Sequence, residues 1–148
     1  MTRLLPGTAL RVRRGRRDDL TQVGALLGAE ASERLERRFR RIVADLGSDV
    51  YVAEDPAGQI VGFVSVVYAR SLVRGGVSAL LDGVRVRAEP RGPLLADLVA
   101  FAEDRARKRG CRRLAAWVAE EDVDLRAALL ARGYRREELL VTDLAGAA

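Results

Sequence analysis

The sequence contains no histidine and a single cysteine, and these absences exclude several kinds of chemistry at once. Without histidine, this chain can form no histidine-based metal site, no Ser-His triad and no Cys-His dyad. Cys111 has no second cysteine with which to form an intrachain disulfide, so we interpret it as a small apolar residue. Carboxylates, tyrosines, arginines and backbone amides are the groups that remain for catalysis and binding, and we expect no metal.

Long apolar segments are also missing. The longest apolar runs, such as 60–68, have the length of a strand, and none approaches the roughly 20 residues that span a bilayer. No extended apolar segment follows Arg3, so we expect no secretory leader, no membrane contact and a cytoplasmic location. A length of 148 residues with 49% hydrophobic residues predicts one globular domain over residues 1–148.

Asparagine is absent and Lys108 is the only lysine, whereas arginine is abundant and gives a formal net charge of +5. A basic surface is one feature of nucleic-acid-binding domains. Most of the arginine runs, however, alternate with Asp or Glu, as on solvated helix faces, and only 5% of residues are aromatic and available for base stacking. We therefore interpret the arginines as a composition bias and disfavour nucleic acid as a partner.

Hydrophobic periodicity, with glycine and proline as breaks, predicts the order β-α-α-β-β-β-α-β-α-β. The expected strands are 9–13, 49–54, 59–68, 78–87, 113–118 and 138–144, and the expected helices are 20–27, 35–46, 94–109 and 123–132. The middle three strands are connected by short links and should be antiparallel, whereas the crossover through helix 94–109 makes its two flanking strands parallel. The sequence therefore predicts an α/β fold with a mixed, mostly antiparallel sheet of about six to seven strands and helices on both faces.

The segment 89–97 places a tight break directly before a long helix. Glu89-Pro90-Arg91-Gly92-Pro93 ends one strand and opens the helix. Such a helix start presents unpaired N–H groups and the positive end of the helix dipole to an anion, and a diphosphate fits that geometry. The alternative interpretation is that Pro93 is the first residue of an ordinary buried helix.

This order of elements, and local sequence over nearly the whole chain, is similar to the GNAT family of N-acetyltransferases. The similar stretches are “RVRRGRRDDLTQVGALL”, “VYVAEDPAGQIVGFVSVV”, “LLDGVRVRAEPRGPLLADLVAFAEDRARKRGCRRLAAWV” and “LRAALLARGYRR”. The resemblance implies acetyl-CoA as co-substrate and direct attack of an acceptor amine on its thioester. It also implies a set of cofactor-binding residues, namely Val84, Val86, Arg91, Gly92, Leu94, Leu95, Ala96 and Asp97.

The diphosphate loop departs from the family pattern at its centre. Arg91 matches the first position of the pattern and Ala96 the last, but Leu94 stands where the family has a glycine. Pro93 lacks an N–H group and so removes one donor, although the amides from Leu95 to Asp97 remain. On the fourth predicted strand, the backbone amides of Val84 and Val86 would polarise the thioester carbonyl.

The resemblance assigns one acid–base group. Asp82 fits the place of the general base, which takes a proton from the acceptor ammonium, and the alternative is a solvated carboxylate. Leu129 stands where many members have a tyrosine that protonates the leaving thiolate, so no general acid is assigned. Glu120 and Asp122 follow the fifth predicted strand and are weaker candidates, interpreted as a solvated acidic loop, and Trp117 is expected in the core.

Three functions follow as alternatives. The first is an N-acetyltransferase acting on an amine of a small molecule or protein, the second is an inactive GNAT-like module with a binding or regulatory role, and the third is a basic nucleic-acid-binding domain. The acceptor is not identified by the sequence, although arginines on the second helix (Arg34, Arg37, Arg38, Arg40 and Arg41) favour an acidic or phosphorylated one. Members of this family often dimerise, so a homodimer is one expected assembly.

Overall fold

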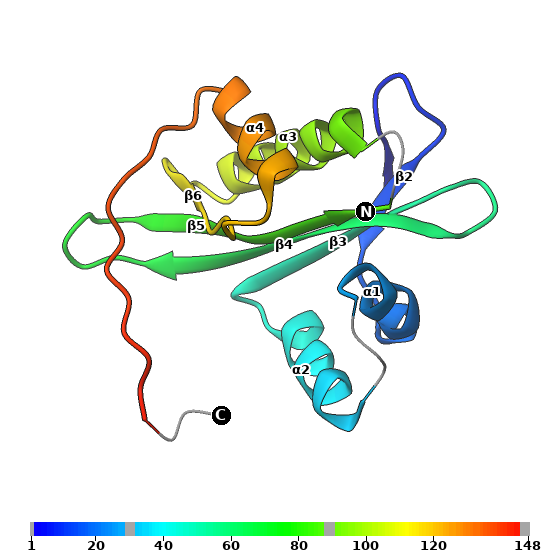
Figure 1. Cartoon of the computed structure of the whole chain (residues 1–148), viewed down its shortest axis with the longest axis horizontal. Coiled ribbons are helices and arrows are strands. Elements are labelled where there is room, and N and C mark those ends of the chain that lie inside the picture. The colour runs from blue at the N-terminus through cyan, green and yellow to red at the C-terminus, as the bar shows by residue number, and fades with distance from the viewer. Residues whose placement is uncertain (1, 29–31, 88–90, 146–148) are drawn as a thin grey trace.

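The computed structural model describes residues 2–28, 32–87 and 91–145, which form one twisted sheet with helices on both faces (Figure 1). The strands are β1 (Thr2–Leu4), β2 (Arg11–Arg14), β3 (Ser48–Glu54), β4 (Ile60–Arg70), β5 (Val77–Val86) and β6 (Leu114–Ala116). The helices are α1 (Leu20–Leu26), α2 (Glu33–Ala44), α3 (Arg91–Lys108) and α4 (Val123–Ala131), and a short 3₁₀ turn (Arg17–Asp19) precedes α1.

The six strands lie in the sheet in the order in which they occur in the chain. Each pair from β1 to β5 is antiparallel, and β5 and β6, which α3 connects, are parallel. Helices α1 and α2 pack against β4 and β3 on one face, whereas α3 and α4 cover the opposite face (Figure 1). The predicted mixed, mostly antiparallel α/β fold is therefore confirmed.

Apolar side chains fill the space on both sides of the sheet, which explains why β3 and β4 have long apolar runs rather than a strict alternation. One cluster lies between the sheet and α3 with α4 and includes Leu81, Leu98 and Leu125, and the other lies under α1 and α2 and includes Phe39 and Phe63. None of the helices in the described ranges has the combination of length and apolar character that a membrane span requires.

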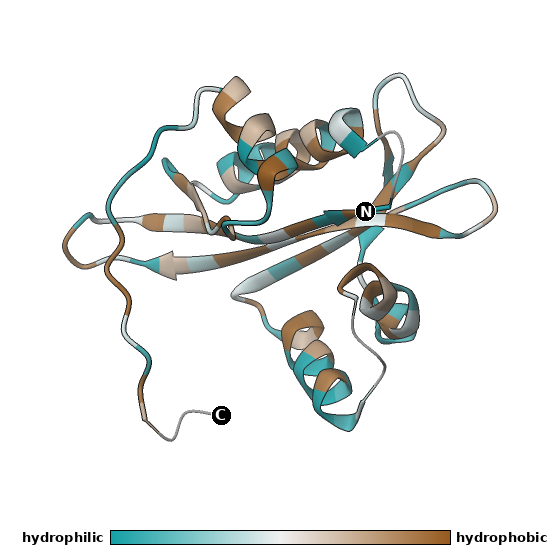
Figure 2. Ribbon diagram, in the orientation of Figure 1, coloured by the Kyte–Doolittle hydropathy of each residue, from teal (hydrophilic) through white to brown (hydrophobic). Residues whose placement is uncertain are grey.

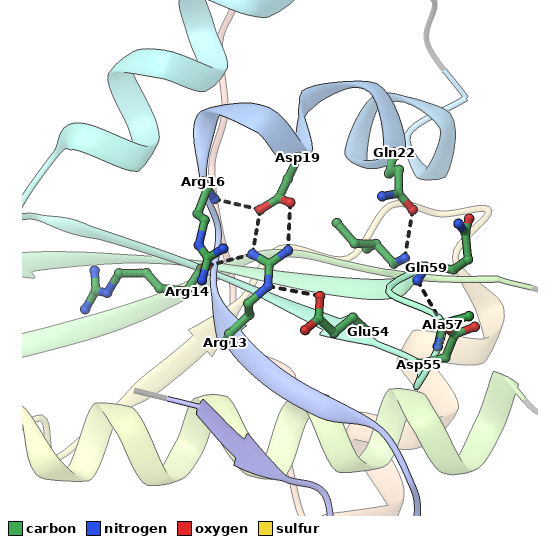
Figure 3. A network of polar contacts seen from close by, with 10 residues as sticks. Arg13, Arg14, Arg16, Asp19, Gln22, Glu54, Asp55, Ala57 and Gln59 are labelled. Carbon is green, nitrogen blue, oxygen red and sulfur yellow. Dashed lines mark hydrogen bonds and ion pairs between the residues drawn. The ribbon is translucent and has the colours of Figure 1, made fainter.

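A polar network fixes the start of α1 to strands β2 and β3 (Figure 3). The Arg13 guanidinium on β2 donates two hydrogen bonds of 2.8 Å to Asp19 and one of 3.1 Å to Glu54 on β3. The backbone N–H of Arg16 also donates to Asp19 at 2.7 Å. Burial alone would raise the pKa of the Asp19 carboxyl, but Arg13 and the Arg16 amide hold it below its ordinary value. In the first turn of α1, the Gln22 side chain accepts a hydrogen bond from the backbone N–H of Ile60.

A second network ties the end of α3 to the strands beneath it. The Asp49 side chain on β3 is fully buried, and its carboxylate pairs at 3.0 Å with both Arg14 and Arg109. The Tyr68 hydroxyl on β4 donates to the same carboxylate at 2.8 Å. Burial, followed by this hydrogen bond to Asp49, raises the pKa of Tyr68. Tyr68 is therefore part of the structural framework.

The prediction of a strand at 138–144 is wrong. Residues 134–145 form no helix or strand, and Leu139, Leu140, Val141 and Leu144 are 65–85% exposed. The segment has β-forming residues but no ladder partner, because it leaves the body after Glu137 pairs with Arg113 and runs past the end of the sheet (Figure 2). The first predicted strand, 9–13, corresponds to β2. It pairs with β1 in a hairpin that the sequence pattern did not indicate.

Candidate active site

A β-bulge places Asp82 in the middle of β5. Ser65 on β4 pairs with Gly83 and the next residue, Val66, pairs with Leu81, so Asp82 is the extra residue that the ladder skips. A bulge of this kind bends its strand and re-aims the side chains around it. The Asp82 side chain is exposed and has no hydrogen-bond or ion-pair partner among the residues that the structure describes. It is free to meet an incoming group.

The ladder between β5 and β6 ends where the bulge begins. Ala79 to Leu81 pair with Leu114 to Ala116, and the last bond runs from the Trp117 N–H to the Leu81 carbonyl at 3.1 Å. Strand β5 continues to Val86, so its outer edge from residue 82 to residue 86 has no strand beside it in the described part of the chain. Unpaired strand edges offer a row of backbone donors and acceptors to a ligand.

The backbone groups of Val84 and Val86 belong to this open edge. The Arg87 N–H donates to Val61 on β4 at 2.9 Å. Because N–H groups alternate in direction along a strand, those of Val86 and Val84 point away from β4. The Val84 carbonyl confirms this direction, because it accepts a hydrogen bond of 3.0 Å from the Arg85 guanidinium, which also reaches α4. Both valine side chains are buried in the core on the α3 face.

The first turn of α3 lies beyond this edge. Residues 88–90, which include the predicted Glu89 and Pro90 break, lie outside the described residues. Among the described residues, α3 begins at Arg91, three residues before the expected start. Its first described amides are those of Arg91, Gly92 and Leu94, while Pro93 has none. The amides of Leu95, Ala96 and Asp97 lie one position or more inside the helix, where the i−4 carbonyls accept them.

Side chains in the same turn divide between packing and open space. Leu94 and Leu95 are buried in the core, whereas Arg91 and Gly92 are exposed. A Cβ atom added at Gly92, or at Gly83 beside the bulge, would meet no other atom within 4 Å. Burial raises the pKa of the half-buried Asp97 carboxyl, and the Arg132 guanidinium opposes that rise. Both glycine positions therefore have open space beside their backbone.

Two ion pairs join this surface to the start of α4. Arg85 Nη1 lies 3.2 Å from Asp122 Oδ2, and Arg91 Nε lies 3.3 Å from Asp124 Oδ2. The sequence pattern indicated Asp122 as a weaker candidate in a solvated acidic loop, and it did not single out Arg85 or Asp124. The available signals were the position of Arg85 between Val84 and Val86 and the i, i+2 spacing of the two acids.

Tyr134, Leu129 and Cys111 all make contacts within the fold. The Tyr134 hydroxyl donates to Glu103 at 3.0 Å, and burial raises its pKa. Leu129 is buried beside α3, so its position in α4 faces the core. Cys111 is also buried, and that burial raises its thiol pKa. Trp117, expected in the core, is instead 54% exposed, because the β5–β6 ladder ends at its N–H group and no further strand covers its side chain in the described residues.

Four arginines gather on one flank of α2, on the face of the sheet opposite α3. Arg34, Arg37, Arg38 and Arg41 line, with Ile42, a shallow hollow of about 510 Å³. None of the four has an ion-pair partner within residues 2–28, 32–87 and 91–145, whereas the neighbouring Arg40 pairs with Glu36 at 2.8 Å. Within the described part of the chain, this flank therefore presents positive charge to solvent that no carboxylate pairs with.

Comparison with known proteins gives a family and a set of similar folds. The Acetyltransferase (GNAT) family matches residues 17–134. No curated protein matches the chain in sequence. A transcriptional regulator from Bacillus halodurans is 23% identical with a TM-score of 0.79, and the match covers 90% of this chain and 99% of that one. An aminoglycoside 6'-N-acetyltransferase from Acinetobacter baumannii is 18% identical, with a TM-score of 0.76 and coverage of 94% and 99%. A ribosomal-protein-alanine N-acetyltransferase from Brucella melitensis is 18% identical, with a TM-score of 0.75 and coverage of 92% and 99%.

Proposed function

Because the chain belongs to the acetyltransferase (GNAT) family, we propose that it transfers the acetyl group of acetyl-CoA directly to an acceptor amine. The observation that carries this proposal is the unpaired edge of β5, which leads from Asp82 past Val84 and Val86 towards the first turn of α3. A backbone edge followed by a helix start offers hydrogen bonds to an extended amide-containing chain and then to its phosphates.

The residues at this surface fit that cofactor. The N–H groups of Val84 and Val86 are unpaired with any described strand, and the exposed Arg91 and Gly92 stand at the positive end of α3. Acetyl-CoA supplies an acyl thioester, whose thiolate is a good leaving group. In the proposal, Val84 and Val86 bind through their backbones, and Arg91, Gly92 and Leu94 offer the first-turn amides. Leu95, Ala96 and Asp97 form the next turn of α3 beside the proposed phosphate site. The side chains of Leu94 and Leu95 hold the helix on the sheet.

Asp82 is the proposed general base. An acceptor ammonium must lose a proton before its nitrogen can attack, and the exposed carboxylate at the bulge would accept that proton, directly or through water. The Val84 N–H then donates to the developing oxyanion, a role that does not depend on side-chain identity. No tyrosine is assigned to the thiolate, because Tyr134 and Tyr68 are hydrogen-bonded to Glu103 and Asp49.

The α2 flank supports an anionic acceptor. Four arginines without described partners would attract an acidic or phosphorylated molecule and repel a polyamine. Preferential turnover of cationic amines would contradict this part of the proposal. The reaction is proposed to take place in the cytoplasm, with the protein as a monomer or a homodimer.

An inactive GNAT-like module is the second candidate, and two observations favour it. Pro93 removes one first-turn donor, and Leu129, at the position of the usual acid, is buried in the core. Such a module would bind CoA, or nothing, without releasing thiol.

The test is release of free CoA thiol from acetyl-CoA in the presence of a panel of amines, including phosphorylated and acidic ones. We expect Asp82→Asn to lower kcat by about 10²- to 10⁴-fold while leaving CoA affinity unchanged. Asp143→Asn, which removes an exposed acid in the C-terminal segment, is the matched control and should behave as the unaltered protein. Binding of CoA without thiol release for any amine would favour the inactive module.

A further inference from the structure

The two ion pairs at the start of α4 neutralise the cations that an anionic cofactor would need. Arg85 and Arg91 carry two positive charges, and Asp122 and Asp124 balance them with two negative charges. The Arg85, Arg91 and Asp124 side chains are 40–59% exposed and can regain water when the pairs open, whereas the Asp122 side chain is 18% exposed and needs another partner. A dedicated anion site would ordinarily leave such cations uncompensated.

Asp122 does not make the helix-capping hydrogen bond that its position allows. It occupies the N-cap of α4, where an aspartate normally accepts a hydrogen bond from a first-turn amide of its own helix. Its side chain makes no such capping bond and reaches Arg85 instead. The Asp124 side chain lies in the first turn of the same helix, where a carboxylate also interacts favourably with the helix dipole. Both acids therefore have a second favourable environment without the arginines.

We propose that Arg85 and Arg91 together bind the phosphates of the cofactor, and that Asp122 and Asp124 are internal counter-ions which the cofactor displaces. The inference rests on the proposed function and assigns Arg85, which no motif singles out, to that site. On binding, each guanidinium moves from a carboxylate to a phosphate oxygen, Asp122 turns to cap α4, and Asp124 stays at the positive end of the helix. The second arginine offsets the donor that Pro93 removes.

The exchange also clears the β5 edge. Arg85 now donates to the Val84 carbonyl at 3.0 Å, at the edge that the amide-containing arm of the cofactor would occupy. Moving Arg85 to a phosphate releases that carbonyl as an acceptor. Displacing Asp122 and Asp124 therefore frees the β5 edge and leaves the positive charges of Arg85 and Arg91 available to the phosphates. The two aspartates thus limit the affinity for the cofactor.

Calorimetric titration with CoA tests this assignment without requiring turnover. Asp122→Asn and Asp124→Asn should each bind CoA about 2- to 5-fold more tightly, the gain expected when a surface ion pair no longer competes. Asparagine caps a helix as well as aspartate does, so Asp122→Asn removes the charge and keeps the cap. Arg85→Ala should weaken binding by about 10- to 100-fold, as for loss of a charged hydrogen bond.

Asp104→Asn is the matched control, because Asp104 also pairs with basic side chains, Arg3 and Lys108, but lies on the later turns of α3. It should leave CoA affinity unchanged. In addition, CoA should slow hydrogen exchange of the first α4 amides in the unaltered protein, and less so in Asp122→Ala, which cannot cap.

Weaker binding by both Asp→Asn variants would overturn the inference, because it would mean that the pairs only hold α4 in place. An unaltered protein that binds no CoA at millimolar concentration would count against the proposed function alone. In that case, binding gained by the Asp122→Asn/Asp124→Asn double variant would support the inference, and continued absence of binding would reject both.

Discussion

Replacing Asp49 by asparagine tests how much the buried network beneath α3 contributes to stability. The substitution keeps the size of the side chain but removes its negative charge. That charge pairs with Arg14 and Arg109, and the carboxylate accepts a hydrogen bond from the Tyr68 hydroxyl. Removing one partner of a buried ion pair costs about 3–5 kcal/mol. Because the Arg14 and Arg109 side chains are 51% and 30% exposed, both guanidinium groups can regain water. We therefore expect the lower end of that range, about 3 kcal/mol, which lowers Tm by roughly 6–12 °C for a chain of this size.

The assay is urea unfolding followed by far-UV circular dichroism, with Asp104→Asn as the control. The Asp104 side chain is 34% exposed and pairs with two exposed cations, so its replacement should change the free energy of unfolding by less than about 1 kcal/mol. A loss below about 1 kcal/mol for Asp49→Asn would refute the reasoning, because the network would then be no stronger than a surface pair.

Three further predictions concern packing, pH and the C-terminal segment. Gly62→Ala should destabilise the protein by about 1–3 kcal/mol in urea unfolding, because its Cβ would lie 3.1 Å from side-chain atoms of Leu98 and Val86, where α3 packs on the sheet. Gly83→Ala, with no atom within 4 Å of the new Cβ, should unfold close to the unaltered protein. Hydrogen bonds from Arg132 and Tyr134 hold the pKa of Glu103 below its ordinary value of 4.5 despite its burial, so the stability that this carboxylate contributes is present at neutral pH and is lost as pH falls through the lowered pKa. Unfolding curves for Glu103→Gln should accordingly show lower stability than the unaltered protein at pH 7 and converge with it in acid; a constant difference would contradict this linkage. Deleting residues 138–148 should leave the free energy of unfolding within about 0.5 kcal/mol, since the large apolar side chains from 139 to 144 are mostly exposed, and a larger loss would mean that the segment packs as a strand.

The sequence predicted those elements whose pattern is local. Helical spacing identified α1, α2, α3 and α4, and β-forming runs between glycine and proline breaks identified β3, β4, β5 and β6, with boundaries that differ by a few residues. The same reasoning failed for 138–144, because β-forming residues indicate a strand but not the partner that it needs. It also missed β1, whose three residues are too short to show a period.

The candidate site was predicted in part. Asp82, Val84, Val86 and Arg91 were named from the sequence, and the structure places the first three on one open edge with the fourth at the start of α3. Their roles stay predictions. The bulge at Asp82 depends on the register between β4 and β5, and the Arg85–Asp122 pair joins residues 37 positions apart, so neither could be read from local pattern. Trp117 was misplaced because its neighbours are apolar, while the end of the β6 ladder is a tertiary feature.

The central claim is that the β5 edge and the start of α3 bind acetyl-CoA, and calorimetric titration of the protein with acetyl-CoA tests it most directly. We expect saturable binding by the unaltered protein and weaker binding by Arg91→Ala, because Arg91 stands at the first turn of α3 where the phosphates would lie. Absence of binding at millimolar acetyl-CoA would contradict the account, because the β5 edge and the start of α3 would then not hold the cofactor.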